Sequence, residues 1–257
     1  MLLAKIIPER IKAAIRPTYQ KLFHGVQQEV GSNLDIAQFD QFEFAYRKGT
    51  TDTIIAGNVP GYRLSKLVPS YDAREGDVIV HIGAHIGASV LASSVDAPMA
   101  KVFGIEASQD TFNLLRINVV LNGAENVSVH RMAIADRNGP VTLYFDTGHW
   151  GHSITKQLSN RSETVEGQTL GDFFNSQGIE QCNLLYLNCE GAEFPILLAA
   201  EQQALAKCQR ILADCHPHLW SKNSITDLKS HLERHGFKTS IIGGGYDRIL
   251  AERDIEA

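Results

Sequence analysis

The chain of 257 residues has a formal net charge of −5, with 44% hydrophobic and 21% charged residues. This composition is ordinary for a globular protein that buries its own core. The acidic surplus argues against a general nucleic-acid-binding protein, which needs a basic surface. The longest uncharged run, residues 78–95, contains histidines, glycines and serines, so we expect no integral membrane segment.

The first 22 residues combine apolar positions at helical spacing with an excess of basic side chains. One interpretation is a helix that binds a membrane surface or a partner. The other is a helix packed on the protein with a solvated basic face, which we favour because Pro8 and Pro17 interrupt the amphipathic face. Charged residues also break the apolar run, so we do not expect a signal peptide.

Residues 38–75 are rich in turn signals and predict short strands and helices. We therefore expect residues 1–75 to form an N-terminal helical or cap segment and residues 76–257 to form the main domain.

From residue 77 onward, apolar runs alternate with amphipathic stretches, which favours an α/β protein with a largely parallel sheet covered on both faces. The last two strands are joined too tightly for a crossover helix, so we expect them to be antiparallel. The predicted strands cover residues 77–83, 101–108, 126–136, 141–146, 153–156, 182–191, 209–217, 237–244 and 247–252, and the predicted helices cover residues 88–95, 110–123, 169–178, 192–205 and 224–236.

The four cysteines, Cys182, Cys189, Cys208 and Cys215, form no CxxC pair. Their spacing matches neither a zinc site nor a disulfide framework. We expect reduced, partly buried thiols in a cytoplasmic protein.

The stretch GAHIG follows the first predicted strand of the regular pattern. Its glycines, Gly83 and Gly87, would let the backbone approach a ligand at the start of a helix. The spacing G-x-x-x-G lacks the third glycine of the dinucleotide fingerprint, which argues against a nicotinamide-dependent dehydrogenase. Glu106, after the next strand, can accept hydrogen bonds from both hydroxyls of a ribose, and Ala133 and Asp136 could line an adenine pocket.

Polar residues also follow the two later strands, at the edge where α/β proteins bind ligands. Glu190 and His216 are candidates for removing a proton from an acceptor, although a structural role for His216 is equally open. The loop TGHWGH adds two further histidines and a tryptophan that could pack on a sugar ring. The histidines at positions 81, 85, 216 and 218 match no standard metal-site spacing, so we predict no metal.

Several motifs in order, from GDVIVHIGAHIG through VFGIEAS and NVVLNG to LLYLNCEGAEF, resemble the FkbM-like family of S-adenosylmethionine-dependent methyltransferases. The similarity covers roughly residues 76–220. It implies a class I, three-layer Rossmann-like fold with a mostly parallel seven-stranded sheet and an antiparallel last strand. It also implies S-adenosylmethionine as cofactor and O-methylation of a sugar, glycan or small natural product.

The resemblance assigns roles to individual positions. Asn118 and Asn122 match the end of a family helix, and Gly191 and Glu193 belong to the later motif. The implied cofactor-binding residues are His81, Gly83, Ala84, His85, Gly87, Glu106 and Ala133. From their chemistry and position we add His216, Glu190 and Asn188 as candidate catalytic residues, and His149, Trp150 and His152 as candidate substrate-binding residues.

The chain departs from the family pattern at four positions. His81 and Asn188 replace aspartates, His85 replaces an asparagine, and Tyr186 replaces a lysine. An acid at position 81 would favour the cofactor's ammonium group, whereas imidazole supplies no negative charge. A second interpretation is therefore a methyltransferase-like binding or regulatory module without catalysis. For either interpretation we expect a small-molecule or glycan ligand and no nucleic acid, and we leave homo-oligomerisation open.

Overall fold

The computed structural model describes residues 33–146, 151–242 and 247–254. The predicted helices of the first 22 residues, together with His149 and Trp150, lie outside the described residues. No helix in the described part of the chain is long and apolar enough to cross a membrane.

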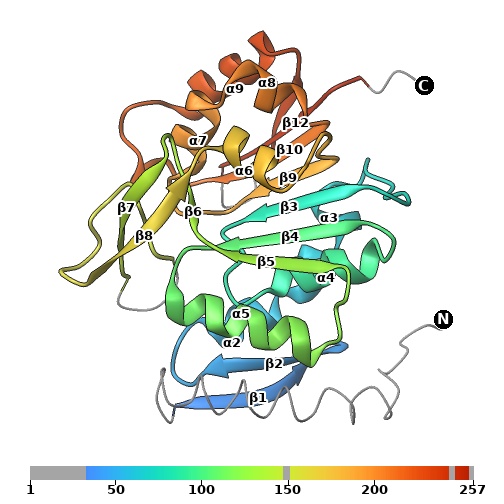
Figure 1. Ribbon diagram of the computed structural model, residues 1–257, viewed down its shortest axis with the longest axis vertical. Helices are drawn as coiled ribbons and strands as arrows, with labels where there is room; N and C mark the ends of the chain where they lie inside the picture. The colour runs from blue at the N-terminus through green and yellow to red at the C-terminus, as the bar shows by residue number, and fades with distance from the viewer. Residues whose placement is uncertain (1–32, 147–150, 243–246, 255–257) are drawn as a thin grey trace.

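A seven-stranded sheet forms the centre of the protein, in the order β11-β12-β10-β9-β3-β4-β5 (Figure 1). Strand β12 pairs antiparallel with both of its neighbours, while β10, β9, β3, β4 and β5 pair in parallel. The predicted architecture, including the antiparallel last strand, is confirmed. The strands are β3 (Val78–Ile82), β4 (Lys101–Glu106), β5 (Val127–Arg131), β9 (Leu184–Leu187), β10 (Arg210–Cys215), β11 (Lys238–Ile242) and β12 (Asp247–Glu252).

Alternating side chains of the central strands enter two separate hydrophobic cores, because successive residues of a strand point to opposite faces. Ile79 belongs to the core beneath α4 and α5, whereas Val80 belongs to the core beneath the C-terminal helices. The three layers are visible in Figure 1. The covering helices are α4 (Ala88–Asp96) and α5 (Gln109–Leu121) on one face, and α6 (Leu170–Ser176), α7 (Glu193–Ala199), α8 (Gln202–Ala206) and α9 (Ile225–Arg234) on the other.

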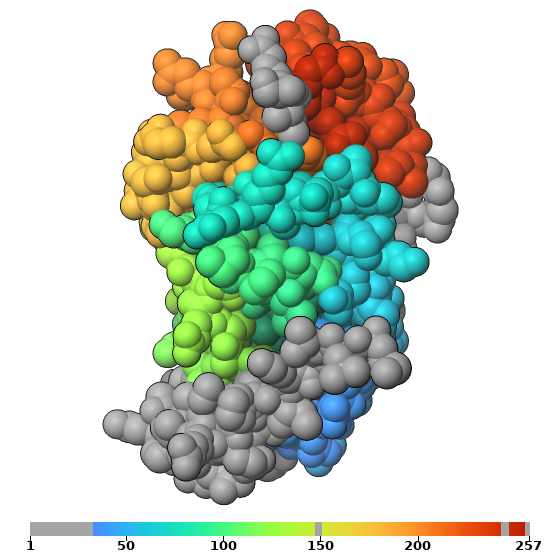
Figure 2. Space-filling model, turned by 90° about the vertical axis from the view of Figure 1, so that its right-hand side faces the viewer, coloured from blue at the N-terminus to red at the C-terminus, as the bar shows by residue number. Residues whose placement is uncertain are grey.

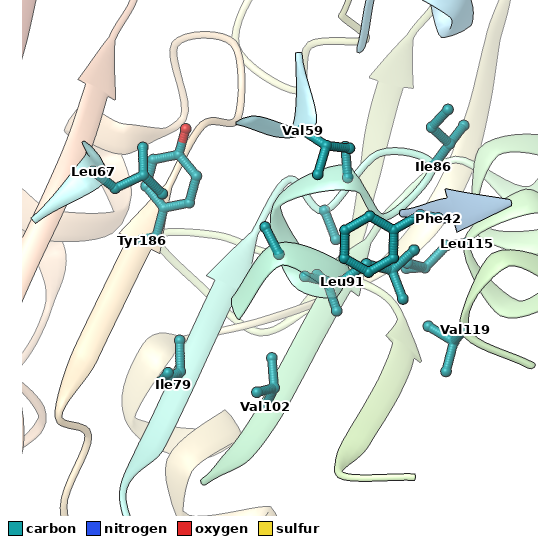
Figure 3. Packing of buried hydrophobic residues seen from close by; sticks show 14 of the residues in the cluster. Phe42, Val59, Leu67, Ile79, Ile86, Leu91, Val102, Leu115, Val119 and Tyr186 are labelled. Carbon is teal, nitrogen blue, oxygen red and sulfur yellow. The ribbon is translucent and has the colours of Figure 1, made fainter. Parts of the chain in front are cut away.

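Residues 33–75 pack outside α4 and α5, and Figure 1 shows their blue strands beside α5. Figure 2 shows blue atoms of this segment toward the bottom of the view. Its side chains share the core of the main sheet: Phe42 packs beside Leu91 and Leu115 in Figure 3. Residues 33–75 and the face of the sheet therefore share one hydrophobic core. The elements are β1 (Leu34–Phe39), β2 (Phe42–Arg47), α2 (Asp52–Gly57), the 3-10 helix η1 (Val59–Tyr62) and α3 (Leu64–Leu67).

Two asparagines on α5 hold β2 in the way that a neighbouring strand would. The Asn118 amide accepts from Ala45 N at 2.7 Å and donates to Ala45 O at 3.1 Å. Asn122 makes the same pair of bonds with the backbone of Glu43. Asn118 also donates to the carbonyl of Ile86, at 2.8 Å, in the turn after β3. The motif NVVLNG therefore joins the N-terminal hairpin to that turn.

Three predicted elements need correction. Residues 153–156 do not form a strand, since Ser153 makes only an isolated bridge with Tyr144. The partner of β7 (Gly139–Tyr144) is β8 (Ser162–Gln168), whose alternating polar residues hid it. The predicted strand over 126–136 divides at Met132, because β6 (Ala133–Ile134) leaves the main sheet to pair with β8.

The third correction concerns the helix predicted over residues 192–205. It is two helices, α7 and α8, because Ala200 and Glu201 adopt extended backbone conformations between them. By contrast, the helix predicted over residues 169–178 is present as α6, with the Thr169 hydroxyl at its N-cap accepting from Asp172 N.

Candidate functional site

A cavity of about 700 Å³ opens at the carboxyl ends of β3, β4, β9 and β10. Side chains from α2 and η1 line it as well, so the N-terminal segment forms one of its walls. The turn at residues 151–154 lines it from another direction. The cavity lies at the edge where open α/β sheets bind their ligands.

Most of the predicted site residues meet in this cavity. His81, Gly87 and Asp136 are exceptions: none of the three belongs to its lining, and Asp136 is exposed on the surface beside Arg137. The predicted residues that line the cavity are Gly83, Ala84, His85, Glu106, Ala133, His152, Asn188, Glu190 and His216.

Glu106 ends β4 as a buried carboxylate in the cavity wall. One oxygen accepts from His85 N at 3.0 Å and the other from Ser108 N at 2.9 Å. A carboxylate has about four acceptor positions, so these contacts leave acceptor capacity for a ligand. Burial raises the pKa of Glu106, while backbone hydrogen bonds from Ser108, His85 and Ala107 act in the opposite direction.

An apolar surface lies next to Glu106. It consists of side chains from β4, β6 and β7 and from the residue between β5 and β6. Such a surface beside a diol-binding carboxylate suits the flat ring of a nucleoside base. Its members are Ile105, Ala107, Met132, Ala133, Ile134 and Leu143.

The glycines of the turn after β3 are required by packing within the protein. A Cβ at Gly83, where φ is +80°, would overlap the backbone carbonyl of Asn188. A Cβ at Gly87, where φ is +100°, would lie 2.9 Å from Leu115 Cδ1. Gly87 does not line the cavity and packs against α5, whereas Gly83 lines the cavity and also packs against the turn after β9.

His81 lies behind the cavity wall. It is on the face of β3 that packs against α4, is only 1% exposed, and its Nε2 lies 3.0 Å from Ser93 Oγ. Its ring meets Tyr186 edge-on, with centroids 5.5 Å apart. Burial lowers the pKa of His81 to about 3, so the ring is neutral at physiological pH. The side chain therefore does not line the cavity.

His85 occupies the turn with a left-handed backbone, φ +50°. Its Nε2 lies 3.9 Å from Asp52 Oδ1, and Asp52 forms a buried ion pair with Arg47. The side chain therefore lies between the cavity and the N-terminal segment. Its backbone N–H, directed at Glu106, joins the turn to the end of β4.

The turn after β9 contains the densest group of ionisable residues in the cavity. Glu190 has a left-handed backbone with φ +53°, and Gly191 follows with φ +96°. Glu193, which is fully buried, accepts from Cys189 N at 2.7 Å and from Gly191 N at 2.9 Å. Glu193 therefore fixes the backbone of the turn and directs Glu190 toward the cavity.

His216 lies between the two glutamates. Its Nδ1 is 3.0 Å from Glu193 Oε1, and its Nε2 is 3.7 Å from Glu190 Oε1. Burial alone would lower the pKa of His216, but the hydrogen bond with Glu193 and the charges of both glutamates raise it to about 9. His216 is therefore an imidazolium at neutral pH.

Glu190 is the partly exposed member of this group, with a quarter of its side chain accessible. Burial raises the pKa of Glu190, and the positive charge of His216 counteracts that effect. Gly151 packs directly over its carboxyl group, where no Cβ could fit. Ser153 Oγ donates to the Glu190 carbonyl at 2.7 Å, so residues 151–153 pack against this glutamate.

The sequence interpretation missed one charged group of the cavity. Tyr186 Oη donates to Asp214 Oδ2 at 2.7 Å, and Arg248 forms a two-pronged ion pair with the same carboxylate. Asp214 and Tyr186 follow apolar strand positions and could be noticed from the sequence. Arg248 could be found only through the antiparallel register that places it opposite Asp214. Within the described residues, no group of three histidines, cysteines or carboxylates has the geometry of a metal site.

Residues 81–239 match the family model described as the methyltransferase FkbM domain. A curated relative is the 31-O-demethyl-FK506 methyltransferase FkbM of Streptomyces tacrolimicus, 23% identical over 197 residues, which are 65% of this chain and 74% of that protein.

Two solved structures with a similar fold are much more distant. The precorrin-6y C5,15-methyltransferase of Geobacter metallireducens is 14% identical, with a TM-score of 0.45 over 84% of this chain and 95% of that one. The fibrillarin of Aeropyrum pernix with natively bound S-adenosyl-L-methionine is also 14% identical, with a TM-score of 0.47 over 86% and 83%.

The family model spans more than half of the chain, including both turns that line the cavity. The strand order and the antiparallel β12 are those expected for a class I methyltransferase. The chain belongs to the FkbM family of S-adenosylmethionine-dependent methyltransferases.

Proposed function

We propose that this protein methylates a hydroxyl group of a sugar, glycan or small natural product, with Glu190 as the base that takes the hydroxyl proton. The observation that carries the proposal is the Glu193–His216–Glu190 arrangement in the cavity wall. The curated relative, an O-methyltransferase by name, supports a hydroxyl as the acceptor.

The cavity fits S-adenosylmethionine in shape and in chemistry. Its volume of about 700 Å³ lies in the range of small-molecule sites. Glu106 retains acceptor positions for ribose hydroxyls, and the wall formed by Met132, Ala133 and Leu143 is apolar, as a base requires. When bound, this cofactor supplies an electrophilic methyl group on a sulfonium.

Three cavity residues have different roles toward the acceptor hydroxyl. Glu190 accepts the proton of the acceptor hydroxyl, because a carboxylate whose pKa is raised by burial is a better base than an exposed one. His216 already holds its proton at neutral pH and instead balances the charge of Glu190. The Asn188 amide lines the same cavity and can orient a hydroxyl by a hydrogen bond, since an amide cannot take up a proton.

The test is methyl transfer from radiolabelled S-adenosylmethionine to a panel of hydroxylated small molecules and glycans. The Glu190→Gln variant should lose at least about a hundredfold in rate, the usual contribution of a general base. It should still bind S-adenosylhomocysteine in calorimetry. The exposed Glu166→Gln variant is the matched control and should keep full activity.

A second candidate function is a binding module without transfer, favoured by the uncharged residues at the motif positions 186 and 188 and by the buried neutral His81. Binding of S-adenosylhomocysteine with no transfer to any hydroxyl, amine or thiol acceptor would select this candidate. Transfer that survives in Glu190→Gln would instead remove Glu190 as the base.

A further inference from the structure

Arg248 is the one arginine or lysine among the described residues that line the cavity. It lies near the start of β12, opposite Asp214 at the end of β10. Its Nε and Nη2 donate to the two oxygens of Asp214, the second at 2.9 Å. This two-pronged geometry fixes the plane of the guanidinium.

Tyr186 completes the group from the neighbouring strand. Its hydroxyl donates to Asp214 Oδ2. Figure 3 shows the hydroxyl oxygen at the free end of the Tyr186 ring. The two oxygens of Asp214 thus accept hydrogen bonds from Arg248 and Tyr186. These contacts leave the two Nη1 protons of Arg248 for a ligand, and a positioned guanidinium with free donors matches the geometry of a carboxylate.

Arg248, Asp214 and Tyr186 lie at the opposite end of the cavity from Glu106, where they could contact the second end of an elongated ligand. Glu106 ends β4, Asp214 lies on β10, and β3 and β9 come between them. Three strand spacings separate the backbones of β4 and β10 across the sheet, a distance of about 14 Å. Gly83, Ala84 and Asn188 line the cavity between these two ends.

S-adenosylmethionine also has two chemically different ends, a nucleoside at one and an α-amino acid at the other. The β3 side of the cavity offers no full positive charge, because His81 is buried, neutral and outside the lining. We propose that Arg248, positioned by Asp214 and Tyr186, binds the α-carboxylate of the cofactor's methionine end. The inference concerns the cofactor that the proposed function uses, but it does not depend on the identity of the acceptor.

The competing location for this carboxylate is the start of α4, where Ala88 and Ser89 line the cavity. A helix N-terminus offers about half a positive charge, whereas the guanidinium offers a full one in a partly buried position. The two locations predict opposite results for an Arg248 variant.

The test compares two ligands that differ only in the amino-acid end. S-adenosylhomocysteine carries the α-carboxylate, and 5′-methylthioadenosine lacks it. Calorimetry on Arg248→Gln should show S-adenosylhomocysteine weakened by about tenfold to a hundredfold, as expected for charged hydrogen bonds, with 5′-methylthioadenosine unchanged. Arg248→Lys should retain part of the affinity, and Arg137→Gln, at an exposed site, should retain all of it.

Removing Arg248 leaves the carboxylate of Asp214 without its partner, so the double variant Arg248→Gln/Asp214→Asn provides a neutral version of the site. Its affinity for 5′-methylthioadenosine reports whether the fold is intact, and it should show the same selective loss.

Equal affinity of wild type and both variants for S-adenosylhomocysteine would overturn the proposal and favour the start of α4. Equal weakening of both ligands would overturn it as well. If the wild type itself binds neither ligand, the assignment of S-adenosylmethionine as cofactor is wrong. This result is distinguished from the other two because it is seen without any variant.

Discussion

The turn after β3 and the turn after β9 meet at the centre of the cavity, and each contains a non-glycine residue with a left-handed backbone. His85 has φ +50° and Glu190 has φ +53°, and a glycine of positive φ lies close to each. Left-handed conformations of such residues are uncommon and need support from their surroundings. In both turns, backbone N–H groups donate to a buried glutamate, which supports the strained conformation. The acceptor is Glu106 in the first turn and Glu193 in the second.

The two turns differ in charge. Near the end of β3, His81 is kept neutral by burial. In the turn that follows, Gly83 packs on the backbone of Asn188. The β9 turn concentrates two glutamates around the imidazolium of His216. Similar backbone conformations thus carry different charges, and under the proposed function the β3 turn lies at the cofactor and the β9 turn supplies the base.

The largest expected effect comes from breaking the contact between the two turns. Gly83→Ala places a Cβ into the carbonyl of Asn188 at a residue whose φ is +80°. We expect a loss of more than about 3 kcal/mol in the free energy of unfolding, or failure to fold, from overlap combined with strain. Denaturant unfolding measures it.

Gly178→Ala is the matched control, since its φ is +64° and no atom lies within 4 Å of the added Cβ. It should lose only about 1–2 kcal/mol from the left-handed conformation. Equal losses at both positions would mean that the contact with Asn188 has no effect.

The next effect tests whether position 81 belongs to the cofactor site. His81→Asp would bury a carboxylate against Ser93 and Tyr186, with no cationic partner in the contacts of His81. We expect it to be less stable than His81→Asn, which has the same shape, by about 3 kcal/mol at pH 7. The gap should close toward acidic pH, where the carboxyl group takes up a proton.

Affinity for S-adenosylhomocysteine should not improve in His81→Asp, because the side chain lies outside the cavity. An aspartate variant as stable as the asparagine variant, with tighter ligand binding, would place residue 81 in the cofactor site after all.

The smallest effect is the opposite pH dependence of the two buried histidines. The pKa of His216 is raised to about 9, so the stability it contributes is complete below pH 6.5 and is lost as the pH rises through 9. The pKa of His81 is lowered to about 3, so its contribution is complete above pH 6.5 and is lost as the pH falls toward 3. Within its span, each contribution changes by about 1.4 kcal/mol per pH unit.

Unfolding free energies of His216→Gln and His81→Asn across pH 5–9, compared with wild type, measure these contributions. In His216→Gln, the free energy of unfolding should depend less on pH than in wild type on the alkaline side only. In His81→Asn, it should depend less on pH on the acidic side only. Flattening on the same side in both variants would contradict the assigned charge states.

The sequence was sufficient for most of the fold and for part of the cavity lining. Alternating apolar strands and amphipathic helices indicated the sheet, and motif order indicated the family, because both follow from local spacing. Strand β8 could not be found in this way, since its SETVEGQ pattern is mostly polar and its pairing with β7 depends on contacts across a long loop. Position along the strand placed Glu106, Glu190 and His216 in one cavity correctly.

What the sequence could not supply was the direction of each side chain and its neighbours. Strand alternation places His81 away from the cavity, yet motif position alone suggested a cofactor contact. Asn118 and Asn122 could be recognised as motif residues, but their bonds to β2 join segments more than 70 residues apart. Arg248 became visible only when β12 was placed antiparallel to β10.

The central claim is that the β9 turn has Glu190 as its base because His216 already carries a proton. An NMR titration of the His216 ring measures that state directly. We predict a pKa near 9 in the wild type, since Glu193 and Glu190 outweigh the effect of burial, and a clear decrease in Glu193→Gln. A wild-type pKa at or below 6.5 would contradict the account and make neutral His216 the base instead.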